Sequence, residues 1–285
     1  MSTNRFCEQL RRELLTRAER LATKAELLPH VYRSLGQPPT ILFKQYVSSG
    51  ELRHGNFHPL SFANILSRTQ WKQRLEKVHS GKNRAFNEND RDEAKELDSC
   101  TSSDALLMNV FCHPSTLTNK PLAKLFGFDL LPQPEFGVKA NLPFAAGGTE
   151  PRSSEIDMRL CGGGRMVLLE SKLTERDFTV CSKAHVERYA GFTEVFNATL
   201  LTQQDGNCAH YQLLRNVLAA HVSNAWFCLV SDERRPDLQE ACREVFRAIT
   251  PLSLQIRCSM VTWQQIAATL PNDLRSFLIE KYGIL

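Results

Sequence analysis

The chain has 285 residues, of which 42% are hydrophobic and 23% charged, and its formal net charge at pH 7 is +4. Such a chain is long and apolar enough for a core that needs no disulfides or structural metal, and no apolar run approaches the ~20 residues that span a bilayer. The N-terminus lacks the apolar centre of a signal peptide, and the nine cysteines are scattered, so we expect a cytoplasmic protein.

Residues 1–100 are expected to form a mainly helical N-terminal extension, with substrate or partner binding as its role. Apolar residues recur at helical spacing over residues 4–28, which predicts one or two amphipathic helices. Glycines and prolines interrupt residues 36–60, which predicts a loop, and a helix is expected near 59–79. The polar stretch 80–100 is interpreted as an exposed connection.

A basic segment lies within this extension. Residues 68–84 contain six lysines and arginines against one acid, with Trp71 and His79 among them. Such a patch can attract phosphate groups. The alternative is a solvated helix face followed by a loop, because the acidic run at 88–98 can neutralise the patch. Both interpretations stay open at this point.

Residues 101–285 are expected to form an α/β domain. Ser102 and Ser103 can cap a helix from Ala105 to Phe111, which Pro114 ends. Short β-like runs follow at Phe136–Leu142, Glu155–Cys161, Met166–Leu173, Ala225–Ser231 and Ile256–Thr262. Helical stretches are expected at about 183–222 (broken near 204–207), before residue 249, and at the C-terminus. This order predicts helices packed around a mixed central sheet.

The informative segment is the pair of β-runs on either side of Gly162-Gly163-Gly164, which predicts an antiparallel hairpin. If the loop runs from Gly162 to Arg165, Cys161 pairs with Met166. Counting outward then places Asp157 opposite Glu170, and Glu155 opposite Lys172. Directly opposed side chains share a face with Cβ atoms ~5 Å apart, and a slip of one residue would break the arrangement.

Clustered carboxylates need a compensating charge. Two negative charges at ~4 Å repel by about 4 kcal/mol at an effective dielectric of ~20, and a hard oxygen-rich site suits Mg²⁺. Lys172 shares the face of Glu170 because side chains alternate along a strand. There it can orient or deprotonate a metal-bound water and balance charge on a transferring phosphate. Ser171 points away, but its backbone carbonyl is a candidate metal ligand.

Asp157, twelve intervening residues and then Glu170-Ser171-Lys172 resemble the D…(D/E)-x-K signature of the PD-(D/E)XK nuclease superfamily. The resemblance covers about the C-terminal two-thirds of the chain and implies a restriction-endonuclease-like fold with an αβββαβ core. It also implies Mg²⁺ (or Mn²⁺) binding by Asp157 and Glu170, with Lys172 as the catalytic lysine. One departure is that Ile156 stands where the family has a proline.

The run Tyr211–Asn216 resembles the glutamine-bearing helix that follows the third strand in many such nucleases. Helical spacing places one set of residues on a polar face and another on a face that can pack inward. The polar face has Gln212, Arg215, Asn216 and Ala219, and the inward face has Leu213, Leu214, Val217 and Leu218. Gln212 can bind the active lysine or a phosphate, and Arg215 a DNA phosphate. An ordinary polar helix face is the alternative for both. Asp104 is a further candidate acid in the first helix, where its charge also suits the helix N-terminus.

Two other constellations compete with this site. Cys181, His185, Cys208 and His210 can be interpreted as a zinc site, although their spacings match no standard zinc motif. Cys181 with His185 can also suggest a thiol nucleophile, but no third orienting residue is evident. A zinc-dependent regulatory protein is therefore a minor alternative.

The favoured interpretation is a Mg²⁺-dependent nuclease that hydrolyses phosphodiester bonds. Asp157, Glu170 and Lys172 form its centre, and Glu155 and Gln212 support them. The expected partner is nucleic acid, with DNA preferred over RNA; homo-oligomers stay open and no membrane partner is expected. The alternative is a non-catalytic nucleic-acid-binding or interaction protein that keeps the nuclease fold.

Overall fold

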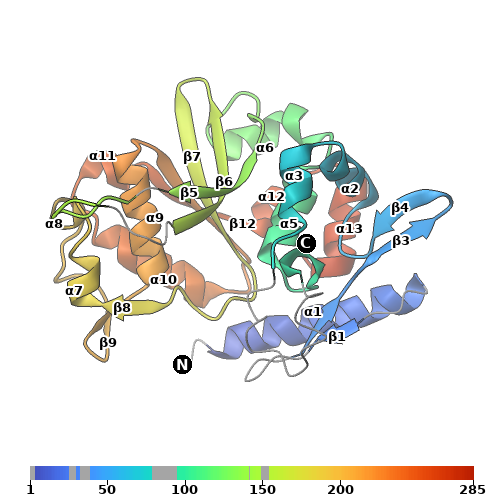
Figure 1. Cartoon of the computed structure of the whole chain (residues 1–285), viewed down its shortest axis with the longest axis horizontal. Helices are drawn as coiled ribbons and strands as arrows, with labels where there is room; N and C mark the ends of the chain where they lie inside the picture. The colour runs from blue at the N-terminus through green and yellow to red at the C-terminus, as the bar shows by residue number, and fades with distance from the viewer. Residues whose placement is uncertain (1–3, 26–29, 33–38, 79–94, 141, 149–153) are drawn as a thin grey trace. The chain divides into compact units, whose positions relative to one another are not determined.

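The computed structural model describes residues 4–25, 30–32, 39–78, 95–140, 142–148 and 154–285 (Figure 1). Contacts between residues divide the chain into two compact units. The first consists of Met1–Cys7 and Ala123–Gln265, and the second of Glu8–Leu122 and Ile266–Leu285. These units are clusters of contacts and do not test separate domains, so the expected boundary near residue 100 stays a prediction.

The first unit is built on a five-stranded mixed sheet. Its strands are β5 (Glu135–Ala140), β6 (Ser154–Gly162), β7 (Arg165–Lys172), β11 (Trp226–Ser231) and β12 (Cys258–Thr262), in the order β12-β11-β7-β6-β5. β5, β6 and β7 are antiparallel neighbours, whereas β7, β11 and β12 run parallel. The expected strands and the mixed sheet of a restriction-endonuclease-like fold are thus confirmed.

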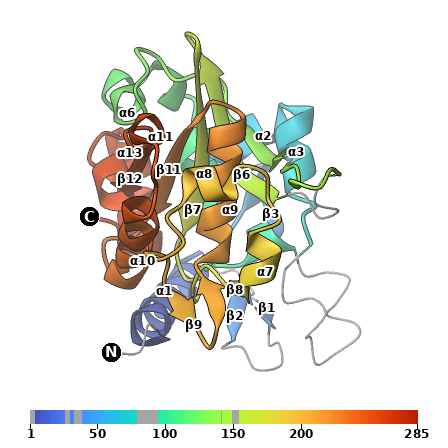
Figure 2. The same ribbon diagram turned by 90° about the vertical axis from the view of Figure 1, so that its left-hand side faces the viewer.

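Two helices cover one face of this sheet. α9 (Tyr211–Val222) packs against β6, β7 and β11, and α10 (Pro236–Arg247) packs against β11 and β12. Figure 2 shows α9 lying in front of β6 and β7. Leu213, Leu214 and Val217 of α9 are fully buried in the apolar cluster between helices and sheet. The helical spacing of these residues therefore predicted the packed face correctly.

The long helix expected over 183–222 is wrong in its first part. That segment contains only the short helices α7 (Lys183–Val186) and α8 (Phe192–Val195), and then a small antiparallel sheet. The sheet consists of β8 (Val180–Ser182), β10 (Asn207–Ala209) and β9 (Gln203–Gln204). Asp205 and Gly206 both have positive φ (50° and 77°) and form the turn between β9 and β10. An Asp-Gly pair is a hairpin signal, and here it outweighs the apolar spacing.

In the N-terminal part, α1 (Asn4–Lys24) confirms the expected helical start. The loop expected over 36–60 is wrong within the described residues. β2 (Thr40–Leu42) pairs with β1 (His30–Tyr32), and β3 (Gln45–Ser48) pairs with β4 (Glu51–His54). Ser49 and Gly50 have positive φ and form the turn of the second pair, so the glycine marked a hairpin. The expected helix near 59–79 is present as α2 (Pro59–Leu66) and α3 (Thr69–Arg74).

The polar stretch 80–100 is not an exposed connection where the structure describes it. Residues 79–94 lie outside the described residues. The following 3-10 helix η2 (Glu96–Asp98) is packed inward, with Leu97 and Asp98 buried. Asp98 Oδ1 lies 3.1 Å from His54 Nε2, which explains how an acid is accommodated there.

The remaining helices complete the two units. They are α5 (Ser103–Phe111), the 3-10 helix η3 (Thr116–Thr118), α6 (Lys120–Leu125), α11 (Leu252–Gln255), α12 (Trp263–Ala267) and α13 (Asn272–Tyr282). Ser102 caps α5 as expected, since its side chain accepts a 3.1 Å bond from Ala105 N–H. Within the described residues, no helix combines the length and the apolar character that crossing a membrane requires.

Candidate active site

The hairpin of β6 and β7 has the expected register. Cys161 pairs with Met166, and Gly162 with Arg165, so Gly163 and Gly164 form a two-residue turn. Both turn glycines have positive φ (57° and 73°), a conformation that glycine adopts without strain. The turn is tighter than the four-residue loop we expected, but the pairing is the same.

The sheet is irregular at Asp157. The β6–β7 ladder ends at Met158↔Leu169, one residue before the expected pair of Asp157 and Glu170. In place of continued pairing, Asp157 Oδ2 accepts a 2.8 Å hydrogen bond from the backbone N–H of Ser171. On the other side of β6, Gly137 of β5 has φ 63° and is skipped in the ladder. Asp157 therefore lies against the segment that carries Glu170 and Lys172, where the strands separate.

The Glu170 carboxylate is completely buried and bonded to three side chains. Oε1 lies 2.8 Å from Lys172 Nζ and 2.5 Å from Gln212 Nε2, and Oε2 lies 2.9 Å from Asn216 Nδ2. Burial raises the pKa of this carboxyl, and the charge of Glu175 adds to the effect, against the lowering influence of Lys172 and Asn216. A buried acid of this kind is a recognised mark of a functional site.

Lys172 is equally buried and belongs to the same network. Its Nζ donates 2.9 Å to Gln212 Oε1, so the amide of Gln212 bridges the lysine and Glu170. Although burial, the largest single influence, opposes the charged form, the attraction of Glu170, Glu175 and Asp157 raises the pKa of Lys172 above its ordinary value. Lys172 is therefore an ammonium ion at neutral pH in this site, and both roles considered above stay predictions.

Two further residues belong to this network: Asn216, which the sequence placed on the face of Gln212 without a role, and Glu175, which the sequence did not single out. Asn216 follows Gln212 by one helical turn and contacts the same carboxylate. From a single sequence, an amide side chain on a helix is expected to be exposed to solvent. Glu175 lies beyond the end of β7, and its Oε2 accepts 2.6 Å from Leu173 N–H. Its charge acts on both Glu170 and Lys172. The signal for Glu175 was its place three residues after the lysine, which a strand-based pattern does not include.

Arg235 holds the chain segment that carries Glu175. This arginine is completely buried; its guanidinium pairs with Asp237 and donates to the carbonyl oxygens of Leu173 (3.0 Å) and Arg176 (3.4 Å). The loop after β11 thus fixes the path of the chain directly after Lys172.

The other sequence candidates lie as follows. Glu155 is exposed and pairs with Lys139 of β5; the β6–β7 ladder does not include the expected pair of Glu155 and Lys172. Ser171 is buried and bonded through its N–H to Asp157, and the metal role of its carbonyl stays a prediction. The Arg215 guanidinium lies 5.2 Å from the centre of the Tyr211 ring, on the helix of Gln212.

The acid of the first helix and part of the basic segment neutralise each other. Asp104 is buried in the first turn of α5 and accepts from Arg74 (2.9 Å) and Lys77 (2.6 Å). Of the basic residues, Lys82 and Arg84 lie outside the described residues, as does His79. In the part that the structure describes, two of the expected phosphate-binding charges thus have a protein partner.

The alternative zinc site is not assembled. Cys181 and Cys208 face each other across β8 and β10, but His185 Nε2 lies 3.1 Å from the Tyr211 hydroxyl and His210 Nε2 lies 3.1 Å from Glu244. These four residues are all described, and they do not form a metal-binding group.

Comparison with known proteins supplies a family. A family model described as Restriction Endonuclease associating with ARP matches residues 31–283, most of the chain. Searches of curated proteins and of solved structures return no match. The matched span includes every residue of the network around Glu170. A family of restriction endonucleases implies a nuclease-related function and an interaction with nucleic acid.

Proposed function

Because the chain belongs to the family of restriction endonucleases associating with ARP, we propose that it is a metal-dependent nuclease of the PD-(D/E)XK type that hydrolyses phosphodiester bonds in DNA. The observation that carries the proposal is the hydrogen bond from Ser171 N–H to Asp157 Oδ2. It brings the first acid of the signature against the Glu170-Ser171-Lys172 segment. A sequence match by chance would not require this contact.

The charges of the network suit a divalent cation. The acids that act on Lys172 are Glu170, Glu175 and Asp157, so three carboxylates surround one ammonium group. Glu170 is completely buried, and Asp157 and Glu175 are half-buried, so this excess of negative charge favours a cation. Carboxylate oxygens are the ligands that Mg²⁺ and Mn²⁺ prefer. Asp157 and Glu170 would hold the ion, with Glu175 as a further acid at the site.

A bound divalent ion would supply the charge that draws a phosphodiester to these acids and would favour ionisation of the attacking water. The residues of the chain position the substrate around it. Lys172, held as an ammonium ion, has two acceptors among the described residues, Glu170 and Gln212. An ammonium group carries three protons. The third is available to a phosphate oxygen, where fixed positive charge stabilises the negative charge of the transition state.

The amides of α9 act as positioning residues. Gln212 donates to Glu170 and accepts from Lys172, and only one orientation of its amide allows both bonds. Asn216 holds the second oxygen of the same carboxylate. Together they fix the orientation of the Glu170 carboxylate within its ion pair with Lys172. Glu155, which is exposed, keeps a supporting role only as a prediction.

The test is cleavage by the purified full chain. Supercoiled plasmid, linear duplex, single-stranded DNA and RNA are incubated with Mg²⁺, Mn²⁺ or EDTA. We expect DNA cleavage with either metal and none with EDTA. Asp157→Asn and Lys172→Met should lower the rate about a thousandfold or more. Asp129→Asn, a change at an exposed acid of the same unit, should leave it unchanged.

Two outcomes would contradict the proposal. Full activity of both Asp157→Asn and Lys172→Met would remove the site from the reaction. Binding of DNA by the folded wild type with no cleavage of any substrate would instead support the alternative of a non-catalytic nucleic-acid-binding protein.

A further inference from the structure

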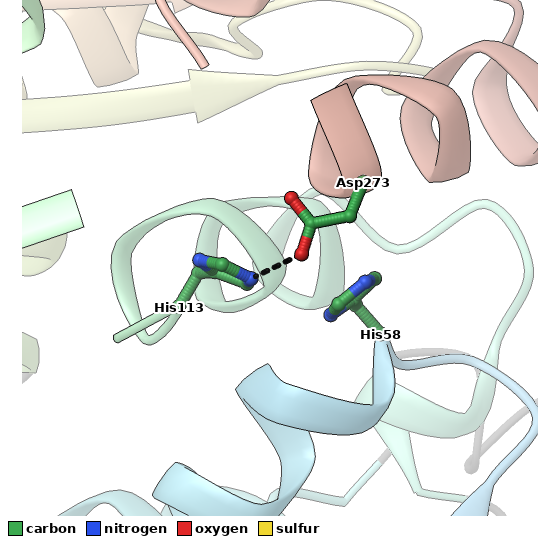
Figure 3. Close-up of side chains that lie close together, drawn as sticks. All are labelled: His58, His113 and Asp273. Atoms are coloured by element: carbon green, nitrogen blue, oxygen red, sulfur yellow. Dashed lines mark ion pairs between the residues drawn. The ribbon is translucent and has the colours of Figure 1, made fainter. Parts of the chain in front are cut away.

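The second unit contains another group of metal-ligand side chains. One ligand atom from each of His58, His113 and Asp273 lies within 4.8 Å of the other two. Figure 3 shows the three side chains converging from separate segments. We propose that these residues bind a transition-metal ion of the zinc class, at a site independent of the Asp157 centre and of the proposed nuclease activity.

The three residues come from the ends of three helices of this unit. His58 is the residue before α2, His113 follows α5, and Asp273 lies in the first turn of α13. His58 is fixed to α5 because its backbone N–H donates 2.6 Å to Asn109 Oδ1. Its ring packs edge-on against Phe277 of α13 at 5.5 Å. A bound ion would therefore tie together segments that are far apart in the sequence.

His113 presents a buried nitrogen toward this group. Nε2 makes no well-formed hydrogen bond among the described residues, and it lies 3.5 Å from Asp273 Oδ2, with which a protonated His113 would form an ion pair (Figure 3). Buried polar atoms normally have a partner, so this one needs an explanation. Two ligands at about 2.1 Å from a tetrahedral zinc ion are about 3.4 Å apart. The separation in the structure matches that value without rearrangement.

The second nitrogen of His113 supports the same assignment. Nδ1 lies 2.8 Å from Ser115 Oγ. When Nδ1 donates its proton to that hydroxyl, it gives up the long 3.4 Å bond that it accepts from Ser115 N–H, and Nε2 keeps the lone pair that a metal needs. Metal-binding histidines usually have such a partner on the other ring nitrogen, because it fixes the tautomer and the ring orientation.

The protonation states also suit a ligand set. Burial lowers the pKa of both His58 and His113, and for His58 the neighbouring His113 and Arg53 act in the same direction, against Asp273. Both rings are thus held in the neutral form that binds metals.

Ligation by His58 has a small cost. Its Nδ1 accepts a 3.3 Å bond from Leu60 N–H at the start of α2. Binding through Nε2 places the ring proton on Nδ1, so this long bond is given up. The loss is minor beside the binding energy of a zinc ion at such ligands.

The donor set selects the metal. Two imidazoles and one carboxylate are the ligands of zinc and of related ions such as Co²⁺ and Ni²⁺, whereas Mg²⁺ prefers oxygen ligands alone. Three protein ligands leave a fourth position for water. The side chain of Asp273 is half exposed, so solvent reaches that position.

The test is metal binding by the full chain after removal of metals with a chelator. Zn²⁺ is titrated in competition with a chromophoric chelator, with excess Mg²⁺ present to occupy the carboxylate centre. We expect one zinc ion per chain, a rise in unfolding temperature, and visible absorption of a low-symmetry site when Co²⁺ replaces Zn²⁺. Asp273→Asn and His113→Ala should weaken binding by about a hundredfold or more, since loss of a supporting residue alone costs about 10–100-fold.

Two variants serve as matched controls. His221→Ala removes a histidine from the last turn of α9, and Asp157→Asn alters the other centre; both should bind zinc as the wild type does. Asp273→Asn preserves the shape of a half-exposed side chain, so it keeps the test valid if His113→Ala fails to fold. Failure of the wild type to bind stoichiometric zinc would overturn the proposal. Unchanged affinity in Asp273→Asn would overturn it as well.

Discussion

The backbone N–H of Ser171 donates a 2.8 Å hydrogen bond to the carboxylate of Asp157. This bond takes the place of strand pairing where the β6–β7 ladder ends. It orients the Asp157 side chain toward the segment that carries Glu170 and Lys172. The contact involves one oxygen of Asp157, Oδ2, and fixes the orientation of the carboxylate. Changes at this position should therefore affect activity more than folding.

Asp157→Asn tests this directly. Asparagine keeps an oxygen that can accept from Ser171, so the fold should persist, while the negative charge for a divalent ion is lost. We expect circular dichroism spectra like those of the wild type. The concentration of Mn²⁺ that gives half-maximal cleavage should rise strongly. An unchanged metal requirement would show that Asp157 does not hold the ion.

Asn216→Leu tests the environment of Glu170. The amide of Asn216 lowers the pKa of Glu170, so its removal raises that pKa further. Activity needs the ionised carboxylate, and the acid limb of the pH–rate profile should therefore move to higher pH. A role in packing alone would lower the rate at every pH without moving the limb. The comparison is a pH profile of Mg²⁺-dependent cleavage for both proteins.

Lys172→Met should cost stability as well as activity. The change leaves the buried Glu170 without its ammonium partner, and breaking a buried pair from one side typically costs about 3–5 kcal/mol. Stability should recover in part at acidic pH, where Glu170 is protonated and needs no partner. Urea unfolding at two pH values measures this. An equal loss of stability in Lys172→Met at both pH values would mean that the loss does not come from the unpaired charge of Glu170.

Arg235→Lys should loosen the segment that carries Glu175. Lysine keeps the charge but cannot reproduce the paired bonds to Asp237 together with those to two carbonyl oxygens. We expect a loss of about 3 kcal/mol in the free energy of unfolding and a lower cleavage rate. Arg243→Lys, on the exposed side of α10, is the control and should change neither.

Lys281 gives a pH-dependent prediction for the second unit. It is buried with its ammonium 4.3 Å from the Phe43 ring, and burial lowers its pKa to about 8. The ordinary value, about 10.5, holds in the unfolded chain. Between pH 8 and 10.5 the lysine is largely protonated in the unfolded chain and largely neutral in the folded protein. The unfolded chain therefore binds more protons, and the free energy of unfolding rises with pH over this range.

Lys281→Met removes the unfavourable free energy of burying this lysine. The variant should be more stable than the wild type at pH 7, by about 2 kcal/mol after allowance for the lost aromatic contact. This gain should shrink toward zero near pH 10. Lys72→Met, at an exposed lysine, should show no such trend. A gain that is independent of pH would mean that burial does not lower the pKa of Lys281 in the folded protein.

The sequence predicted what depends on neighbours along the chain. The hairpin register from Met158 and Leu169 to the turn followed from strand alternation and a glycine turn. Asp157, Glu170 and Lys172 belong to the same hairpin, and they are linked by the Ser171 N–H bond to Asp157 and by the ion pair of Lys172 with Glu170. Gln212 was predicted from a resemblance, and its bonds to Glu170 and Lys172 are present.

What depends on distant segments could not be predicted. Asn216 and Glu175 join the site only because α9 and the loop held by Arg235 lie where they do. His58, His113 and Asp273 have no spacing that a pattern could detect. The segment 183–209 has helical apolar spacing but folds as short helices and a small sheet, because Gly191 and Gly206 have positive φ there.

We propose that Asp157 and Glu170 together hold a divalent ion. The most direct test is the anomalous scattering of Mn²⁺ in a crystal of the full chain. Our account predicts a manganese peak within bonding distance of both carboxylates, and no such peak in Asp157→Asn. A wild-type crystal of a Mn²⁺-active preparation with manganese bound only elsewhere would contradict it.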